Sequence, residues 1–179
     1  ELFPDSRIFP DANSTLRVTY GKVNGYEPSD AVAYNHVTYL DGVIEKYVPG
    51  DYEFDVPQKL IDLYNTKDYG PYADKNGKLP INFIGTNHTT GGNSGSPALD
   101  AHGNLIGLNF DRVWEGTMSD IYYDPAICRN IMVDARYILF IIDIAKIIYD
   151  SEMNLKYRFF FKKFRRILRK PEKIRNYSL

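Results

Sequence analysis

Apolar and polar positions change their period along the first part of the chain. Residues 14–23 (STLRVTYGKV) alternate as a strand does, and residues 36–48 (HVTYLDGVIEKYV) have strand-like composition around a glycine. Residues 56–70 have helical spacing instead, with Pro57 suited to a first turn and Gly70 suited to the stop. The apolar positions that share one face of this helix are Leu60, Ile61 and Tyr64. The pattern predicts two strands followed by a helix.

The second part of the chain is richer in strand signals. Residues 73–78 (ADKNGK) predict a turn, and residues 79–87 (LPINFIGTN) predict a short apolar strand. Residues 96–112 read as a hairpin, because the sequence DAHGN separates two apolar runs. Residues 129–150 begin with strand-like residues and continue as a helix. We therefore expect a mainly β body with one or two helices.

Composition and charge separate the end of the chain from the rest. The 179 residues suffice for one domain with a core, and the 15% aromatic content, mostly tyrosine, favours strands. Residues 156–179 hold ten of the 22 Lys and Arg residues but only one of the 23 acidic residues. The body is therefore acidic and the last segment strongly basic, as in two compositions joined end to end.

Other features exclude several classes of protein. Cys128 is the only cysteine, so there is no internal disulfide, and the redox compartment stays open. Residues 1–17 have no basic-then-apolar pattern of a secretory signal. The apolar run 137–149 is interrupted by Asp143 and Lys146, and it is too short for a membrane span. With one cysteine and three scattered histidines, we expect no metal and no organic cofactor.

Residues 92–97 (GNSGSP) place a serine between small residues. Glycines permit the unusual backbone angles of a turn that presents a nucleophile, and they let substrate approach the main chain. The plain alternative is a surface loop in which these residues serve turn geometry only. The segment resembles the GDSGGP turn of chymotrypsin-like serine peptidases, which implies that Ser94 is the nucleophile and that the amides of Gly92 and Ser94 form the oxyanion hole. Asn93 stands where many of those enzymes have an aspartate that pairs with a new N-terminus, so activation by that ion pair is not expected.

A longer resemblance extends the comparison. Four segments are similar to the C-terminal region of the bacterial dipeptidyl-peptidases 7 and 11: residues 15–28, 40–57, 87–134 and 137–143. The similarity covers about residues 10–155. It implies a double-barrel, chymotrypsin-like peptidase domain with an inserted helical domain, acting on peptides with a free N-terminus.

The same resemblance implies a division of this chain. We expect a mainly β fold in which residues 1–134 form the second β-barrel of the peptidase domain. Residues 135–155 would be a closing helix, and residues 156–179 a basic extension. The family also suggests a periplasmic or cell-envelope location and leaves a homodimer open.

The segment GLNFDR assigns a specificity by the same resemblance. Asp111 would help to hold the α-ammonium group of the substrate, and Arg112 would select Asp or Glu as the second residue, which is the preference of dipeptidyl-peptidase 11. A guanidinium binds a carboxylate through two parallel hydrogen bonds and stays charged at working pH. Neighbouring strand residues point to opposite faces, so Asp111 and Arg112 need not neutralise each other. The alternative is a solvated pair at a strand end.

A general base is harder to find. The chain offers His36, His88 and His102, but none matches the catalytic histidine of the family, which precedes the inserted domain. We assign His88 to loop structure, His102 to an exposed turn and His36 to packing. The chain is thus expected to be the nucleophile-bearing part of a peptidase, inactive without the first barrel. A non-catalytic peptide-binding module is the alternative.

The basic segment 156–179 has several interpretations. It mixes phenylalanines with Lys and Arg, as an amphipathic helix for anionic membranes or a nucleic-acid contact would. The interpretation we favour is an appended segment with no evolved role. Membrane contact therefore stays an open alternative, and nucleic-acid binding is not expected.

Overall fold

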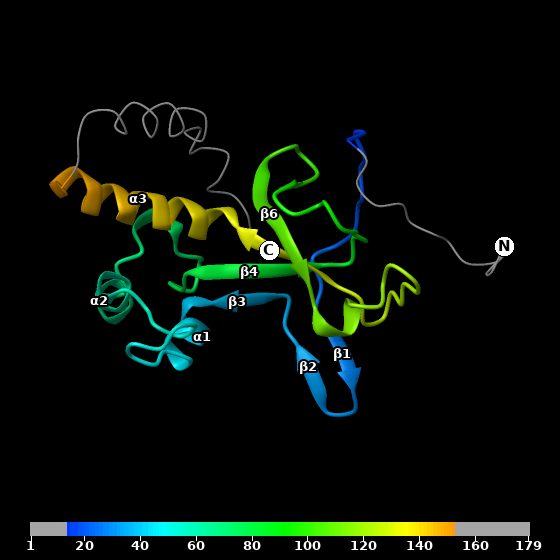
Figure 1. The fold of residues 1–179 in the computed structure, drawn as a ribbon, viewed down its shortest axis with the longest axis horizontal. Coiled ribbons are helices and arrows are strands. Elements are labelled where there is room, and N and C mark those ends of the chain that lie inside the picture. The colour runs from blue at the N-terminus through cyan, green and yellow to red at the C-terminus, as the bar shows by residue number, and fades with distance from the viewer. Residues whose placement is uncertain (1–13, 153–179) are drawn as a thin grey trace.

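A five-stranded antiparallel sheet forms the centre of the chain in a computed structural model, which describes the backbone of residues 14–152 and the side chains of residues 14–144 (Figure 1). The strand order is β3-β4-β7-β6-β5, so β3 and β5 are the edges. The strands are β3 (Val37–Tyr39), β4 (Pro80–Gly85), β5 (Pro97–Leu99), β6 (Leu105–Arg112) and β7 (Asn130–Asp134). The two strands that carry the candidate site, β5 and β6, lie at one side of this sheet.

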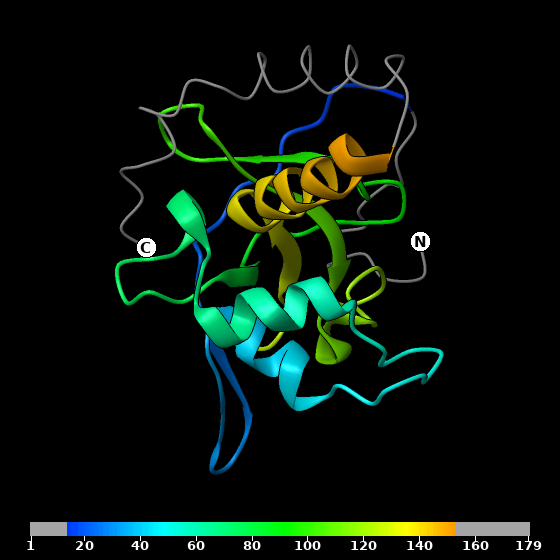
Figure 2. The same cartoon turned by 90° about the vertical axis from the view of Figure 1, so that its left-hand side faces the viewer.

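The hydrophobic core lies where three helices meet the start of β4. These helices are α1 (Leu40–Glu45), α2 (Gln58–Thr66) and α3 (Ala135–Glu152), and they gather at one end of β3 and β4 (Figures 1 and 2). The buried residues of this cluster are Leu40, Val56, Leu60, Tyr69, Leu79, Ile81, Phe140 and Ile144. Burial of apolar surface on this scale is the main source of stability for a small domain. The helices thus anchor one end of the sheet and leave the other end to the loops.

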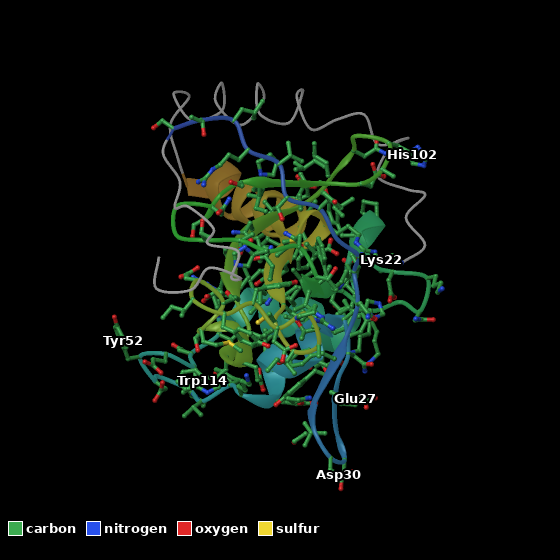
Figure 3. The ribbon with its side chains drawn as sticks, turned by 90° about the vertical axis from the view of Figure 1, so that its right-hand side faces the viewer. Lys22, Glu27, Asp30, Tyr52, His102 and Trp114 are labelled. Carbon is green, nitrogen blue, oxygen red and sulfur yellow. The ribbon has the colours of Figure 1, made fainter. Side chains whose placement is uncertain are left out.

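A small hairpin of β1 (Tyr26–Ser29) and β2 (Val32–Tyr34) projects from the sheet, with Asp30 at its tip (Figure 3). Its base is fixed by Arg129, which is buried and donates hydrogen bonds to the carbonyl oxygens of Asn24 and Gly25. The hydroxyl of Tyr26 also donates to Glu115, at 2.6 Å. These contacts tie the hairpin to the loop that follows β6.

Several predicted elements are confirmed. The helix predicted at 56–70 is α2, and the turn predicted at 73–78 is closed by a hydrogen bond from Asp74 N–H to the Lys78 carbonyl. The predicted strand 79–87 is β4, and the hairpin 96–112 is β5 and β6. The change from strand to helix within 129–150 occurs between β7 and α3.

The strand predicted at 14–23 is wrong for the described structure. Only Val23 pairs, through an isolated bridge to Gly85. The apolar residues of the alternating pattern, Leu16, Val18 and Tyr20, are 97%, 83% and 91% exposed. Alternation predicts a strand only if a second strand and a core cover the apolar face. Within residues 14–144, neither covers this segment.

Two boundaries also differ from the sequence-based expectation. The strand-like run 36–48 ends at Tyr39 and becomes α1, because Leu40, Val43 and Ile44 have the i, i+3, i+4 spacing that faces the core. Helix α2 stops at Thr66, and its C-cap is Lys67, in the left-handed conformation at φ 55°, whereas Gly70, with φ 53°, lies beyond the helix at the start of a short 3-10 turn. A long side chain at this position is unusual, so no local pattern predicts a stop there.

The prediction of a mainly β body followed by a C-terminal helix is confirmed. The basic extension 156–179 lies outside the described residues, as do residues 1–13. None of the helices within residues 14–152 combines the length and the hydropathy that crossing a bilayer requires.

Candidate active site

Ser94 lies in the loop between β4 and β5, at the tip of a tight turn. Gly92 and Gly95 flank it with φ angles of +87° and +83°, which only glycine adopts without strain. The side chain of Asn93 holds the turn, because its Oδ1 accepts a 3.0 Å hydrogen bond from the amide of Thr90. The carbonyl of Asn93 accepts another from the amide of Ser96, at 3.0 Å. Asn93 therefore serves the shape of this turn.

Along the turn, main-chain amides that donate a hydrogen bond alternate with amides that donate none to the described residues. The amide of Asn93 donates to the Thr90 carbonyl at 3.3 Å, and the amide of Gly95 donates to the Asn109 carbonyl at 2.8 Å. The amides of Gly92 and Ser94 donate to no acceptor among the residues that the structure describes. These are the two amides that the sequence comparison assigned to the oxyanion hole. Donors that are fixed in place but unused can stabilise a negative charge that develops beside the serine.

The side chain of Ser94 is exposed and lies against β6. Its Oγ donates a long, 3.4 Å hydrogen bond to the main-chain carbonyl of Phe110. The neighbouring turn is fixed to the same strand, since the Asn109 amide donates to the Ser96 carbonyl at 2.9 Å. The serine turn is thus an extension of the β5–β6 pairing, and Ser94 contacts that strand two residues before Arg112.

A β-bulge in β6 separates these two features. Asn109 pairs with Met132 of β7, but the next pair joins Asp111 to Ile131, so Phe110 is an extra residue on β6. A bulge adds one residue to a strand and reverses the faces of all residues after it. A count by alternation from Asn109 would therefore place Asp111 and Arg112 on the wrong faces, and only the register against β7 corrects it.

The guanidinium of Arg112 is engaged by the loop that follows β6. Its Nη1 and Nη2 donate to the two carboxylate oxygens of Asp120 at 2.8 and 2.9 Å, and Nη1 also donates to Ser119 Oγ at 2.7 Å. The hydrogen bonds from Arg112 lower the pKa of the Asp120 carboxyl, and those to Asp120 raise the pKa of Arg112. Sequence reasoning missed both partners, because they lie in an irregular segment without a periodic pattern.

Asp111 does not pair with the Arg112 side chain. Asp111 is exposed, and its Oδ1 accepts a 2.8 Å hydrogen bond from the main-chain amide of Arg112. The expectation that the two side chains need not neutralise each other agrees with this arrangement, although the ion pair of Arg112 with Asp120 was not foreseen.

The three histidines have separate environments. The ring of His88 donates from Nε2 to the Ser119 carbonyl at 3.0 Å and packs edge-on against Tyr123. His102 is exposed and projects outward from the β5–β6 turn (Figure 3). His36 is half-buried just before β3. The contacts of His88 are those of a residue that holds the loop, as expected from the sequence.

A buried polar group lies beneath the serine turn. Thr89 Oγ1 donates to Asn130 Oδ1 at 2.9 Å, and all three of Thr89, Asn109 and Asn130 are buried. Asn109 Oδ1 and Asn130 Nδ2 have no partner within the described residues. Sequence reasoning missed these residues, because asparagines in strands give no signal of burial. Nowhere in the described part of the chain do three or more His, Cys, Asp or Glu side chains come together as a metal site would need.

Comparisons with known proteins extend this picture. The model of the peptidase S46 family matches residues 1–148. The chain is 81% identical over 143 residues to an Asp/Glu-specific dipeptidyl-peptidase of Flavobacterium psychrophilum, covering 80% of this chain and 20% of that protein. It is 49% identical over 143 residues to dipeptidyl-peptidase 7 of Porphyromonas gingivalis, again covering 80% of this chain and 20% of that protein. The chain thus spans about a fifth of the length of the curated relatives it matches.

Solved structures of DPP11 from Porphyromonas endodontalis are similar in fold. The complex of that protein with the dipeptide Arg-Asp matches with a TM-score of 0.69 and 54% identity, covering 70% of this chain and 18% of that one. The complex with substrate matches with a TM-score of 0.72 and 52% identity, covering 79% and 21%. This likeness confirms the mainly β, chymotrypsin-like fold class expected from the sequence.

Proposed function

The chain belongs to the peptidase S46 family, as its resemblance to the dipeptidyl-peptidases predicted, and we propose that it carries the nucleophile and the acidic-residue pocket of a serine dipeptidyl-peptidase. The whole protein would release dipeptides with Asp or Glu in the second position from free N-termini. The observation that carries this proposal is the serine turn, in which Ser94 Oγ stands exposed beside the unused amides of Gly92 and Ser94.

The chemistry of such a site is acyl transfer. Ser94 Oγ attacks the carbonyl carbon of the peptide bond after the second residue, and a base removes its proton. The amides of Gly92 and Ser94 stabilise the oxyanion, and the departing amine takes the proton from the protonated base. Water, which gives a proton to the same base, then attacks the acyl carbon, and Ser94 Oγ leaves with that proton as the dipeptide is released. We assign the histidine base and its orienting aspartate to the part of the longer protein outside this chain, because His88, the histidine nearest to Ser94 in sequence, is engaged with Ser119.

Arg112 supplies the preference for an acidic second residue in this proposal. A half-buried guanidinium that met a neutral side chain would remain without its substrate partner, whereas a carboxylate gains two charge-assisted hydrogen bonds. Relatives named Asp/Glu-specific and a DPP11 bound to Arg-Asp or Arg-Glu support this assignment. The exposed carboxylate of Asp111 is the proposed partner of the substrate α-ammonium group.

Peptide hydrolysis by the full-length protein tests the proposal. We expect release of Xaa-Asp and Xaa-Glu from fluorogenic dipeptide substrates, little release of Xaa-Leu, and covalent labelling of Ser94 by a fluorophosphonate. Ser94→Ala should abolish both hydrolysis and labelling, while Ser96→Ala, in the same turn, should retain both. Binding of acidic peptides without cleavage or labelling would instead identify a peptide-binding module and would overturn the proposal.

We propose further features of the whole protein from its resemblance to the family. We propose that residues 1–134 belong to the second barrel, that residues 135–155 form its closing helix, and that residues 156–179 are an appended basic segment. We also propose a periplasmic or cell-envelope location, which cell fractionation with detection of the protein would test. Recovery of the protein in the cytoplasm alone would contradict that location.

A further inference from the structure

The Arg112 guanidinium uses some of its N–H donors in hydrogen bonds to described residues, and it keeps others unused. A guanidinium has five N–H donors in one plane. Three of them are used, by the two oxygens of Asp120 and by Ser119 Oγ. The remaining two, on Nε and Nη2, donate to no acceptor among the residues that the structure describes. Those two hydrogens point in the same direction, so together they form a complete edge for a carboxylate.

We propose that Asp120 and Ser119 are positioning residues, which lock the Arg112 guanidinium so that its free Nε–Nη2 edge receives the carboxylate of the substrate's second residue. This inference rests on the proposed function and deepens it. Asp120 fixes the Nη1–Nη2 edge through two hydrogen bonds, and Ser119 fixes the remaining hydrogen of Nη1. An arginine held at three points keeps one orientation, and that pre-organisation favours binding of a planar carboxylate.

Ser119 is suited to this role because it is itself held rigidly. The residue is only 3% exposed, and its amide donates to the Gly116 carbonyl at 3.0 Å. Its own carbonyl accepts the hydrogen bond from His88 Nε2. His88 lies in the loop that leads into the serine turn. Ser119, which holds Arg112, is therefore connected to the loop that carries the proposed nucleophile.

Asp120 is not expected to compete with the substrate for the same edge. The side chain of Asp120 is 45% exposed, compared with 22% for that of Arg112. Water can therefore screen the charge of Asp120, and its repulsion of a second carboxylate is weakened. If Asp120 instead occupied the substrate's own position, its removal would improve the binding of acidic peptides. This difference makes the two arrangements separable by experiment.

The test compares two variants in the full-length protein, Asp120→Asn and Ser119→Ala, with Asp68→Asn as a control. Asp68 is an exposed aspartate in the turn after α2, so this control removes the same charge away from Arg112. We expect kcat/KM for Xaa-Asp and Xaa-Glu substrates to fall at least about tenfold in both variants, mainly through a higher KM. The control should match the wild type.

Fluorophosphonate labelling of Ser94 provides a readout that needs the serine turn but no acidic pocket. We expect an unchanged labelling rate in Asp120→Asn and Ser119→Ala. A higher kcat/KM for acidic peptides in Asp120→Asn would show that Asp120 competes with the substrate, and it would overturn the inference. An equal loss of labelling and hydrolysis in both variants would do the same, because it would indicate a general structural role.

Arg112→Met in the same assays separates this inference from the proposed function. If the wild type does not release acidic dipeptides, the proposed function fails and the inference fails with it. If the wild type does release them, Arg112→Met should lose the acidic preference. Wild-type kinetics for both Asp120→Asn and Ser119→Ala would then refute only the positioning role.

Discussion

Ser94 Oγ donates its hydrogen bond to the carbonyl of Phe110, the residue that forms the bulge of β6. The contact joins the proposed nucleophile to the one position that breaks the regular pairing of β6 with β7. Arg112 follows two residues later and pairs with Asn130. The bulge therefore supplies the carbonyl that Ser94 meets and lengthens β6 by one residue before Arg112.

Deletion of Phe110 tests the role of the bulge. Without the extra residue, Asn109 and Asp111 would be neighbours, and β6 would pair regularly with β7 while Asp111 and Arg112 keep their partners Ile131 and Asn130 and therefore their faces. The deletion would remove the carbonyl that Ser94 Oγ meets and would draw Arg112 nearer to Asn109, which holds the serine turn. We expect kcat/KM of the full-length protein for acidic peptides to fall at least about 100-fold, because Ser94 and Arg112 would lose their placement relative to each other. Phe110→Ala is the matched control, since it keeps the bulge and the carbonyl and should retain most of the activity. Equal activities of the two variants would contradict the role of the bulge.

A second prediction concerns the left-handed glycines of the two turns around β5. Gly95 and Gly103 have φ angles of +83° and +77°, and a methyl group at either position would meet no atom within 4 Å. Alanine at each site should therefore cost only the backbone strain, about 1–2 kcal/mol. Only Gly95→Ala should also slow the labelling of Ser94, because the Gly95 amide fixes the turn to Asn109. Thermal unfolding and labelling rates of the full-length variants give both readouts, and equal labelling rates would refute the distinction.

A third prediction concerns Arg129, the buried cation that holds the base of the β1–β2 hairpin. Arg129 is 6% exposed, and its guanidinium donates to main-chain carbonyls of two segments, one just before β1 and one just before β7. Its acceptors are the carbonyl oxygens of Asn24, Gly25, Pro125 and Cys128. Arg129→Met would remove all of these hydrogen bonds and leave part-buried carbonyl acceptors without the guanidinium, so we expect the free energy of unfolding to fall by about 3 kcal/mol or more. Thermal unfolding of the full-length protein and of the variant measures this loss of stability.

Lys59→Met is the control for that variant, because it makes the same kind of change at an exposed position of α2. Hydrogen exchange adds a local readout. The hairpin of residues 26–34 should exchange faster in Arg129→Met and should be unchanged in Lys59→Met. A hairpin that stays protected in Arg129→Met would show that other contacts hold it.

The parts of the fold that sequence reasoning predicted are those decided by neighbours in the chain. Leu60, Ile61 and Tyr64 give helical spacing whatever lies around them, and their helix appears as α2. The turn between β5 and β6 is also local, because Asp100 Oδ1 accepts hydrogen bonds from the amides of His102 and Asn104. Such features need no knowledge of the rest of the molecule.

The parts that could not be predicted depend on pairing across the chain. The alternation at Leu16 and Val18 is regular, yet a strand also requires a neighbour, and no residue from 14 to 144 supplies one. The bulge at Phe110 appears only from the register of β6 against β7. Asp120 meets Arg112 through an irregular loop, for which residue spacing predicts no direction. The serine turn was recognisable from its residue types. Ser119 and Asp120, the residues that hold Arg112, were not.

A final prediction concerns the pH dependence of stability, through Asp74 in the turn before β4. Partial burial acts to raise the pKa of the Asp74 carboxyl, but hydrogen bonds from the amides of Lys78 and Asn76 and from the Tyr39 hydroxyl outweigh it. The pKa in the folded protein is therefore below its ordinary value of 3.8. A depressed pKa means that the ionised carboxyl stabilises the fold above pH 3.8 and that this contribution is lost as the pH falls through the folded value.

Urea unfolding of the full-length protein, from about pH 3 to about pH 7, measures this contribution. The stability of wild type should exceed that of Asp74→Asn most at neutral pH, and the difference should shrink towards the acid end. Tyr39→Phe removes one of the three hydrogen bonds to the carboxyl and should show a smaller difference with the same direction. A constant difference between wild type and Asp74→Asn at every pH would show that ionisation of this carboxyl does not stabilise the turn, because linkage requires the gap to follow protonation.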